Sequence, residues 1–253
     1  MPFHIDRGSD RGSAQQGWLT ARHSFSFADW HDPQRMGFGA LKVLNDDIFA
    51  AGGGFGPHPH ENFEIVTIPL EGRLRHQDDA GHQAEIGAGD VQMMSAGQGV
   101  VHSEINASAT KPVSLIQVWI TPEKTGGSPR YAQRFFDWKK KEGVFYTLVE
   151  PDAASGVNPQ EIAPLRIHQK AWIRGGRFAP GTRKTLLNPG PNHGLYLFVL
   201  EGSVLVQGAS VGRRDAFAGW GETSVRFEVP EDGSVAEVLL FEVPLLGQDP
   251  TRH

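Results

Sequence analysis

The chain has 253 residues, of which 39% are hydrophobic and 21% charged, and its formal net charge is −5. This is the composition of an ordinary globular protein, and a mildly acidic chain has no global attraction for nucleic acid or for an anionic membrane. The absence of cysteine excludes disulfides, thiolate metal sites and a cysteine nucleophile. No run approaches the roughly 18 apolar residues of a membrane span, and the N-terminus lacks a signal-peptide core, so we expect a cytoplasmic protein.

Short runs rich in Val, Ile, Leu and Phe recur along the chain and are separated by Gly, Pro, Asn and Asp. The runs at residues 63–70, 113–120, 195–206 and 235–243 each predict a strand. Helical periodicity is scarce, and only residues 129–138 predict a short helix. Many short strands with turn signals between them predict an all-β sandwich or barrel.

The first candidate site follows a glycine-rich stretch at residues 52–56. His58 and His60 are two positions apart, and residues at that spacing point to the same face of a strand. His102 and Glu104 have the same spacing farther along the chain. If both segments are neighbouring strands, three imidazoles and one carboxylate face one cavity. This ligand set suits a divalent first-row metal such as iron, nickel, copper, manganese or zinc.

A second carboxylate is available close to the first histidine pair. Glu64 is four residues after His60, so on a continuous strand Glu64 and Asn62 would face the same cavity. Glu64 could then be a ligand, a general base, or an outer partner that orients a ligating histidine. Glu61 would point the other way, and we expect it at the surface.

An isolated histidine is more often a surface or hydrogen-bonded residue than a metal ligand. The chain has 11 histidines, and those without a partner at ligand spacing are expected to have this ordinary role. They are His4, His23, His31, His76, His82, His168, His193 and His253.

The two halves of the chain also share a similar sequence pattern. An apolar run ends in Leu-Glu-Gly at residues 70–72 and again at 200–202, and each predicts a hairpin with the run that follows. The repeat predicts two similar β lobes, with the join in the Gly- and Pro-containing stretch 121–143. We divide the chain into an N-terminal lobe, residues 1–130, and a C-terminal lobe, residues 131–253.

Aligning the two halves tests whether the second lobe keeps the ligand set. No ligand is found at the aligned positions, so we expect the C-terminal lobe to lack a metal site. The residues opposite His58, His60, Glu64, His102 and Glu104 are Asn188, Gly190, Gly194, Phe227 and Val229.

Two stretches resemble the two cupin motifs and, more closely, the pirin family. They are residues 57–64, Pro-His-Pro-His-Glu-Asn-Phe-Glu, and residues 95–104, Ser-Ala-Gly-Gln-Gly-Val-Val-His-Ser-Glu. Residues 24–30, Ser-Phe-Ser-Phe-Ala-Asp-Trp, also look like pirin. The resemblance covers the N-terminal half strongly and the C-terminal half loosely. It implies a bicupin, two β-sandwich barrels (double-stranded β-helices) in one chain, with the active site in the N-terminal lobe.

The resemblance also implies a ligand set. Pirins hold one metal, usually Fe(II), with residues that match His58, His60, His102 and Glu104. Ordinary cupins take their carboxylate from the place of Glu64, whereas pirins take it from the place of Glu104. The resemblance therefore favours Glu104 as the ligand and leaves Glu64 as an outer partner.

Bacterial pirin-like proteins are associated with quercetin 2,3-dioxygenase activity. The first hypothesis is thus a metal-dependent dioxygenase that opens the central ring of a small aromatic, flavonol-like substrate with O2, and in which Glu104 or Glu64 takes the hydroxyl proton. The second is a metal-containing regulatory or redox-sensing module that binds a protein partner, contacts no nucleic acid directly and has no physiological substrate. A third is a promiscuous activity on flavonols that is not the biological role.

Overall fold

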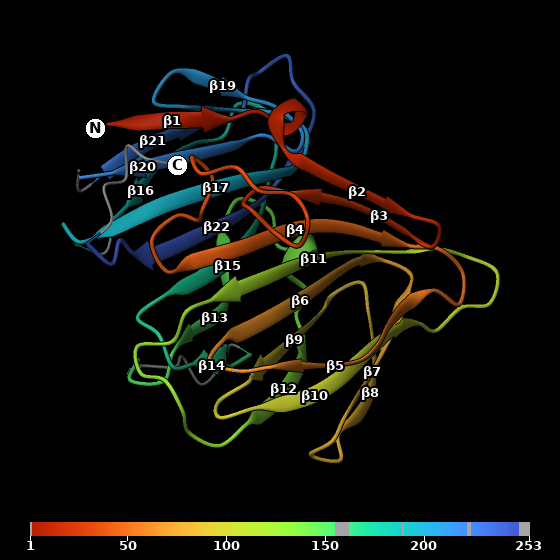
Figure 1. The fold of residues 1–253 in the computed structure, drawn as a ribbon. Coiled ribbons are helices and arrows are strands. Elements are labelled where there is room, and N and C mark those ends of the chain that lie inside the picture. The colour runs from red at the N-terminus through yellow and green to blue at the C-terminus, as the bar shows by residue number, and fades with distance from the viewer. Residues whose placement is uncertain (1, 155–161, 189, 222–223, 248–253) are drawn as a thin grey trace.

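The structure is a computed structural model that describes residues 2–154, 162–188, 190–221 and 224–247 (Figure 1). These residues form strands and two short 3-10 helices, η1 (Gly8–Asp10) and η2 (Trp138–Lys140). The strands make two seven-stranded and two four-stranded sheets. The predicted all-β fold of two sandwich lobes is therefore confirmed. Among these described residues, no helix has the length and apolar character needed to cross a membrane.

The N-terminal lobe pairs a seven-stranded sheet with a four-stranded sheet. The larger sheet runs, in spatial order, β12 (Arg130–Phe135), β9 (Asp90–Ser95), β6 (Glu64–Glu71), β11 (Val113–Ile120), β4 (Leu41–Phe49), β3 (Leu19–His23) and β2 (Gly12–Gln16). The smaller sheet runs β5 (Gly54–His60), β10 (Val100–Asn106), β7 (Arg73–Asp78) and β8 (Gln83–Gly87).

The C-terminal lobe repeats this plan. Its larger sheet runs β1 (Phe3–Asp6), β20 (Ala216–Trp220), β17 (His193–Glu201), β22 (Ala236–Pro244), β15 (Trp172–Phe178), β13 (Phe145–Pro151) and β14 (Leu165–Ile167). Its smaller sheet runs β16 (Arg183–Leu187), β21 (Ser224–Glu228), β18 (Val204–Val206) and β19 (Ala209–Val211). The division at 130/131 stays a prediction, and strand pairing crosses it in both directions, because β1 pairs with β20 and β12 with β9.

Two expectations about local structure are wrong. The predicted helix at residues 129–138 is instead β12 followed by η2, because residues 130–135 pair along their whole length with β9. The Leu-Glu-Gly turns do not close hairpins, so residues 195–206 are two strands. At Gly72 (φ 78°) and Gly202 (φ 76°) the chain turns sharply and passes from the larger sheet to the smaller one. Both positions need the left-handed backbone that glycine adopts without strain.

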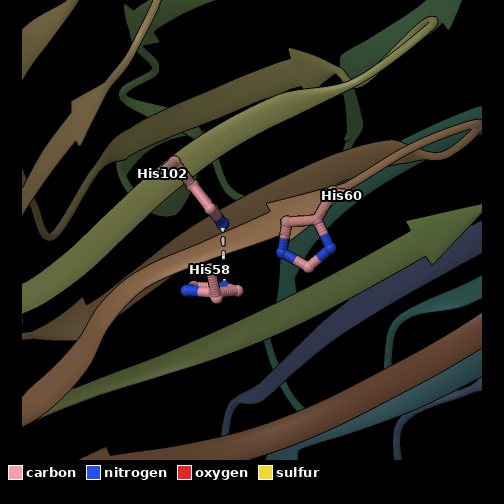
Figure 2. Close-up of side chains that lie close together, drawn as sticks. All are labelled: His58, His60 and His102. Atoms are coloured by element: carbon pink, nitrogen blue, oxygen red, sulfur yellow. Dashed lines mark hydrogen bonds between the residues drawn. The ribbon is translucent and has the colours of Figure 1, made fainter.

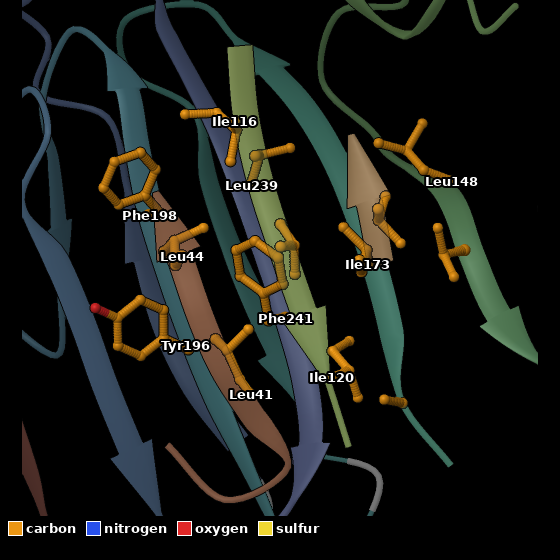
Figure 3. Packing of buried hydrophobic residues seen from close by; sticks show 14 of the residues in the cluster. Leu41, Leu44, Ile116, Ile120, Leu148, Ile173, Tyr196, Phe198, Leu239 and Phe241 are labelled. Carbon is orange, nitrogen blue, oxygen red and sulfur yellow. The ribbon is translucent and has the colours of Figure 1, made fainter. Parts of the chain in front are cut away.

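The two seven-stranded sheets pack face to face and bury an apolar core between the lobes (Figure 3). The N-terminal sheet contributes residues such as Leu41, Leu44, Ile116 and Ile120, and the C-terminal sheet contributes residues such as Ile173, Tyr196, Phe198, Leu239 and Phe241. The lobes are thus held by a shared hydrophobic layer, and each four-stranded sheet covers the opposite, inner face of its own lobe.

The two lobe interiors differ in chemistry. The C-terminal interior is a second apolar core that contains Phe227 and Val229, the residues aligned with His102 and Glu104. The N-terminal interior instead buries polar groups, including Thr67, His76, Gln92, His102, Glu104 and Gln117. Smaller apolar clusters, around Leu74 and Ile86 and around Ile65 and Met94, lie in the same lobe as these polar groups. That the C-terminal lobe binds no metal stays a prediction.

We expect Leu197→Ala to destabilise the C-terminal lobe by about 2–5 kcal/mol, because Leu197 is buried in that apolar core and its loss leaves a cavity. Leu187→Ala is the matched control, since Leu187 is 70% exposed and its loss should change the free energy of unfolding by no more than about 0.5 kcal/mol. Urea unfolding of both variants measures the difference. Equal midpoints would contradict the assignment of this core.

Candidate metal centre

The site lies where β5 and β10 pair in the four-stranded sheet of the N-terminal lobe. His58 and His102 are direct cross-strand partners in this antiparallel pair. Gly54, at the start of β5, lies so close to the backbone of Glu104 and Ile105 that a Cβ atom would collide with it. The glycine that precedes the histidine pair thus lets β5 lie against β10.

Three of the four predicted ligands meet in one place (Figure 2). The ring centroids of His58, His60 and His102 are 4.5–4.8 Å apart. The Nε2 atoms of His58 and His102 are 3.1 Å apart, and one ligand nitrogen from each of the three rings lies within 4.8 Å of the others. His102 is 2% exposed, whereas His58 and His60 are half-buried. The cluster therefore has a buried floor and an accessible side.

Glu104 lies outside the three-histidine cluster, in a second group with His102 and His76. It is 1% exposed, and its carboxylate accepts hydrogen bonds from Gln117 Nε2 (2.7 Å), Thr67 Oγ1 (3.2 Å) and Gln92 Nε2 (3.4 Å). A carboxylate oxygen of Glu104 lies within 4.8 Å of a ligand nitrogen of His102 and one of His76. His102 is thus common to two groups of potential ligands.

Burial sets the protonation of these side chains. Burial, together with the neighbouring His58, lowers the pKa of His60 to about 4. Burial, together with the neighbouring His58, His60 and His76, lowers the pKa of His102 to about 2. Burial raises the pKa of Glu104. Near pH 7, His60 and His102 are therefore neutral, and each has one ring nitrogen whose lone pair can bind a cation. The Nδ1 atom of His102 is buried with no hydrogen-bond partner. These residues fit a divalent metal.

Glu64 does not face this cluster, so the expectation that strand parity carries it into the cavity is wrong. Asn62 has a φ of 54°, which ends β5 before β6 begins, and its side chain accepts a hydrogen bond from Gly126 N. Glu64 is buried, accepts a 2.7 Å hydrogen bond from Ser95 Oγ and lies near His168. Nothing in these contacts supports a catalytic role for Glu64. Glu61 is exposed, as predicted.

His76 lies beside the predicted ligands His102 and Glu104, and sequence reasoning did not place it there. It lies on β7, opposite Glu104 on β10, and its side chain is fully buried. Its Nε2 atom is 3.1 Å from Asp78 Oδ2. The spacing His76-x-Asp78 was a usable signal, since it places an acidic partner on the same strand face as the histidine. His253 lies outside the described residues.

Aromatic rings surround the accessible side of the histidine cluster. Trp119 packs edge-on against His60 at 4.7 Å between centroids, and Phe55 lies 5.7 Å from His58. Phe27 and Phe63 pack against Trp119 in turn, at 5.4 and 5.2 Å. The rings make an apolar wall beside a polar cluster, an arrangement typical of a small-molecule site.

Comparison with known proteins assigns this arrangement to a family. The family model Pirin matches residues 7–120, and the Quercetinase C-terminal cupin domain matches residues 156–243. A quercetin 2,3-dioxygenase from Escherichia coli K12 is 37% identical over 96% of this chain and 99% of its own length. The chain belongs to the pirin family. Its fold is the bicupin that the resemblance implied.

Other members of the pirin family agree with this assignment. A putative quercetin 2,3-dioxygenase from Pseudomonas aeruginosa is 40% identical over 92% of this chain and 95% of its own length. The crystal structure of the bacterial pirin YhhW from Escherichia coli in complex with nickel(II) is 37% identical, with a TM-score of 0.86 over 96% of this chain and 99% of that one. Nickel(II) is bound in that crystal structure of YhhW.

Proposed function

We propose that this pirin is a metal-dependent dioxygenase that acts on flavonols such as quercetin and uses O2. In this proposal one divalent metal, Fe(II) in the cell, is held by His58, His60, His102 and Glu104, and Ni, Cu, Mn or Zn can take its place. The observation that carries the proposal is the cluster of three close imidazoles beside the aromatic wall. The names of the relatives supply the reaction class.

The chain's own residues have separable roles in this chemistry. When bound, a divalent metal supplies Lewis acidity at the flavonol hydroxyl and a centre for reaction with O2. His58, His60 and His102 would hold it with ring nitrogens. The Glu104 carboxylate would take up the hydroxyl proton. Gln117 and Thr67 fix its orientation by hydrogen bonds.

The aromatic wall determines how the substrate lies. Trp119 and Phe55 flank the histidine cluster. A flat flavonol can pack against these rings while its hydroxyl faces the cluster. A large exposed apolar patch would favour the alternative, a regulatory module with a protein partner. The large exposed apolar residues of the described chain, such as Phe3, Ile48 and Leu187, belong to different strands.

The decisive assay is turnover by metal-loaded protein. Protein reconstituted with Fe(II) or Ni(II) should consume quercetin and O2 and release carbon monoxide, faster than the same concentration of free metal. Loss of flavonol absorbance, O2 uptake and carbon monoxide are measured together. If flavonol loss does not exceed that with free metal for either ion, the proposed activity is wrong.

Trp119→Ala is expected to raise the KM for quercetin by about 2- to 12-fold, the equivalent of an aromatic contact of about 0.5–1.5 kcal/mol. Metal content should not change, because Trp119 offers no ligand atom to the cluster. Trp172→Ala is the control, since Trp172 is a half-buried tryptophan in the C-terminal lobe. Steady-state kinetics and metal analysis of the two variants test this role. An equal change in KM for both would argue against a substrate contact at Trp119.

A further inference from the structure

His76 brings an imidazole into the interior of the N-terminal lobe. Its Cα atom is paired across the sheet with that of Glu104, and its ring centroid is 5.3 Å from that of His102. Ligand atoms of His76, His102 and Glu104 lie within 4.8 Å of one another, and all three side chains are buried. The group has the composition of a metal site, two imidazoles and a carboxylate.

Asp78 determines which nitrogen of His76 is free. The Asp78 carboxylate can only accept hydrogen bonds, so at 3.1 Å the Nε2 atom of His76 carries the hydrogen and donates it. A neutral His76 ring then has its lone pair on Nδ1. This Nδ1 atom is buried and has no hydrogen-bond partner. An unpaired buried acceptor lowers stability, so a metal ion bound at Nδ1 would offset that cost.

We propose that His76 is a further metal-binding residue, whose Nδ1 atom joins His102 and Glu104 in an inner coordination position beneath His58 and His60. Asp78 is its positioning residue, in the carboxylate–histidine–metal arrangement that fixes the tautomer and orientation of a ligating ring. This inference rests on the proposed metal centre and does not depend on flavonol turnover.

The inner position serves the same ion as the three-histidine cluster. A neutral imidazole has one lone pair, so His102 can bind only one ion at a time. His76 therefore adds a ligand to that ion and makes no second site. The aromatic ring of Tyr131 stacks on His76 at 4.8 Å and 28°, which holds the imidazole in place.

His82 is a natural control for these contacts. It also lies within hydrogen-bond distance of Asp78, at 3.0 Å, and its ring also stacks on Tyr131, at 5.0 Å and 21°. Its side chain is 42% exposed, and its ligand atoms do not belong to either close group. A change at His82 disturbs the same carboxylate and the same ring without removing a ligand.

The test is Co(II) binding to the metal-free full-length protein, with affinity measured by chelator competition and coordination followed by the visible absorption bands of Co(II). His76→Gln should bind Co(II) at least about 10-fold more weakly and shift the bands. Asp78→Asn should weaken binding by about 10- to 100-fold, the usual effect of losing an outer partner. His82→Gln should match the wild type. Thermal unfolding of each metal-free variant shows whether it is folded.

The possible results separate this inference from the metal centre itself. A folded His76→Gln protein with wild-type Co(II) affinity and spectrum would overturn the role of His76, while loss of binding in His102→Ala would leave the proposed centre standing. Should metal-free His76→Gln be unfolded, Asp78→Asn decides, and an unchanged affinity and spectrum there overturns the inference. A wild-type protein that binds no Co(II) overturns both.

Discussion

His102→Ala is expected to lower metal affinity by well over about 100-fold, so that the protein loses its metal on dialysis. His102 is the one residue shared by the outer histidine cluster and the inner group with His76 and Glu104. Its removal takes a ligand from both, whereas loss of a single outer partner usually weakens binding only about 10- to 100-fold. His58→Ala should also lose metal, but it leaves the inner group complete. Elemental analysis after dialysis gives the metal content of each variant.

The matched control is His193→Ala. His193 is a half-buried histidine at the start of β17 in the C-terminal lobe, and its Nε2 atom lies 3.0 Å from the Lys170 carbonyl oxygen. Its loss should leave the metal content unchanged. Because His102 is buried, circular dichroism must show that the alanine variant is folded. Wild-type metal content in both His58→Ala and His102→Ala would rule out the proposed ligands.

The part of the site that depends on the alternation of side chains along a strand could be predicted from the sequence. His58 and His60 share one face of β5, and their cluster with His102 follows from spacing within single strands. Parity holds only while a strand continues, and this is why Glu64 was misplaced. Asn62 adopts a left-handed φ of 54°, which asparagine tolerates better than most residues. The alternation of side-chain directions along β5 therefore does not continue into β6.

Contacts between strands could not be read from the sequence. His76 faces Glu104 because of the register between β7 and β10, and no local pattern states that register. The hydrogen bonds to Glu104 come from three different strands of the opposite sheet, through Thr67, Gln92 and Gln117. These residues look ordinary in the sequence and become part of the site only when the two sheets pack.

Contacts between distant strands also explain why the turns at Gly72 and Gly202 were wrongly predicted to close hairpins. The repeat of Leu-Glu-Gly correctly indicated two similar lobes, and Gly72 and Gly202 have nearly equal φ values. Nothing local distinguishes a turn that closes a hairpin from one that crosses to the other sheet. In the structure an added Cβ at Gly72 would meet the Pro112 carbonyl, and one at Gly202 would meet the Val235 carbonyl. The neighbouring strand, distant in sequence, requires the glycine.

Glu104→Gln and Glu64→Gln are expected to have opposite outcomes. Glutamine keeps the size of the side chain and removes the charge. At position 104 both carboxylate oxygens accept hydrogen bonds, from Thr67 and Gln92 on one side and Gln117 on the other. An amide there turns an NH2 group toward a donor and withdraws the negative charge from the metal. We expect metal affinity to fall by at least about 100-fold and quercetin turnover to be lost.

At position 64 the amide oxygen of glutamine can still accept the hydrogen bond from Ser95 Oγ. Burial already raises the pKa of Glu64, so removing its charge costs little. Glu64→Gln should therefore keep its metal and turn over quercetin at nearly the wild-type rate. Metal content and quercetin consumption are measured side by side on both variants. Loss of metal in Glu64→Gln, with no effect of Glu104→Gln, would contradict this prediction. The metal would then take its carboxylate ligand from the first motif, as in ordinary cupins. Glu104 would serve only as part of a hydrogen-bonded polar core.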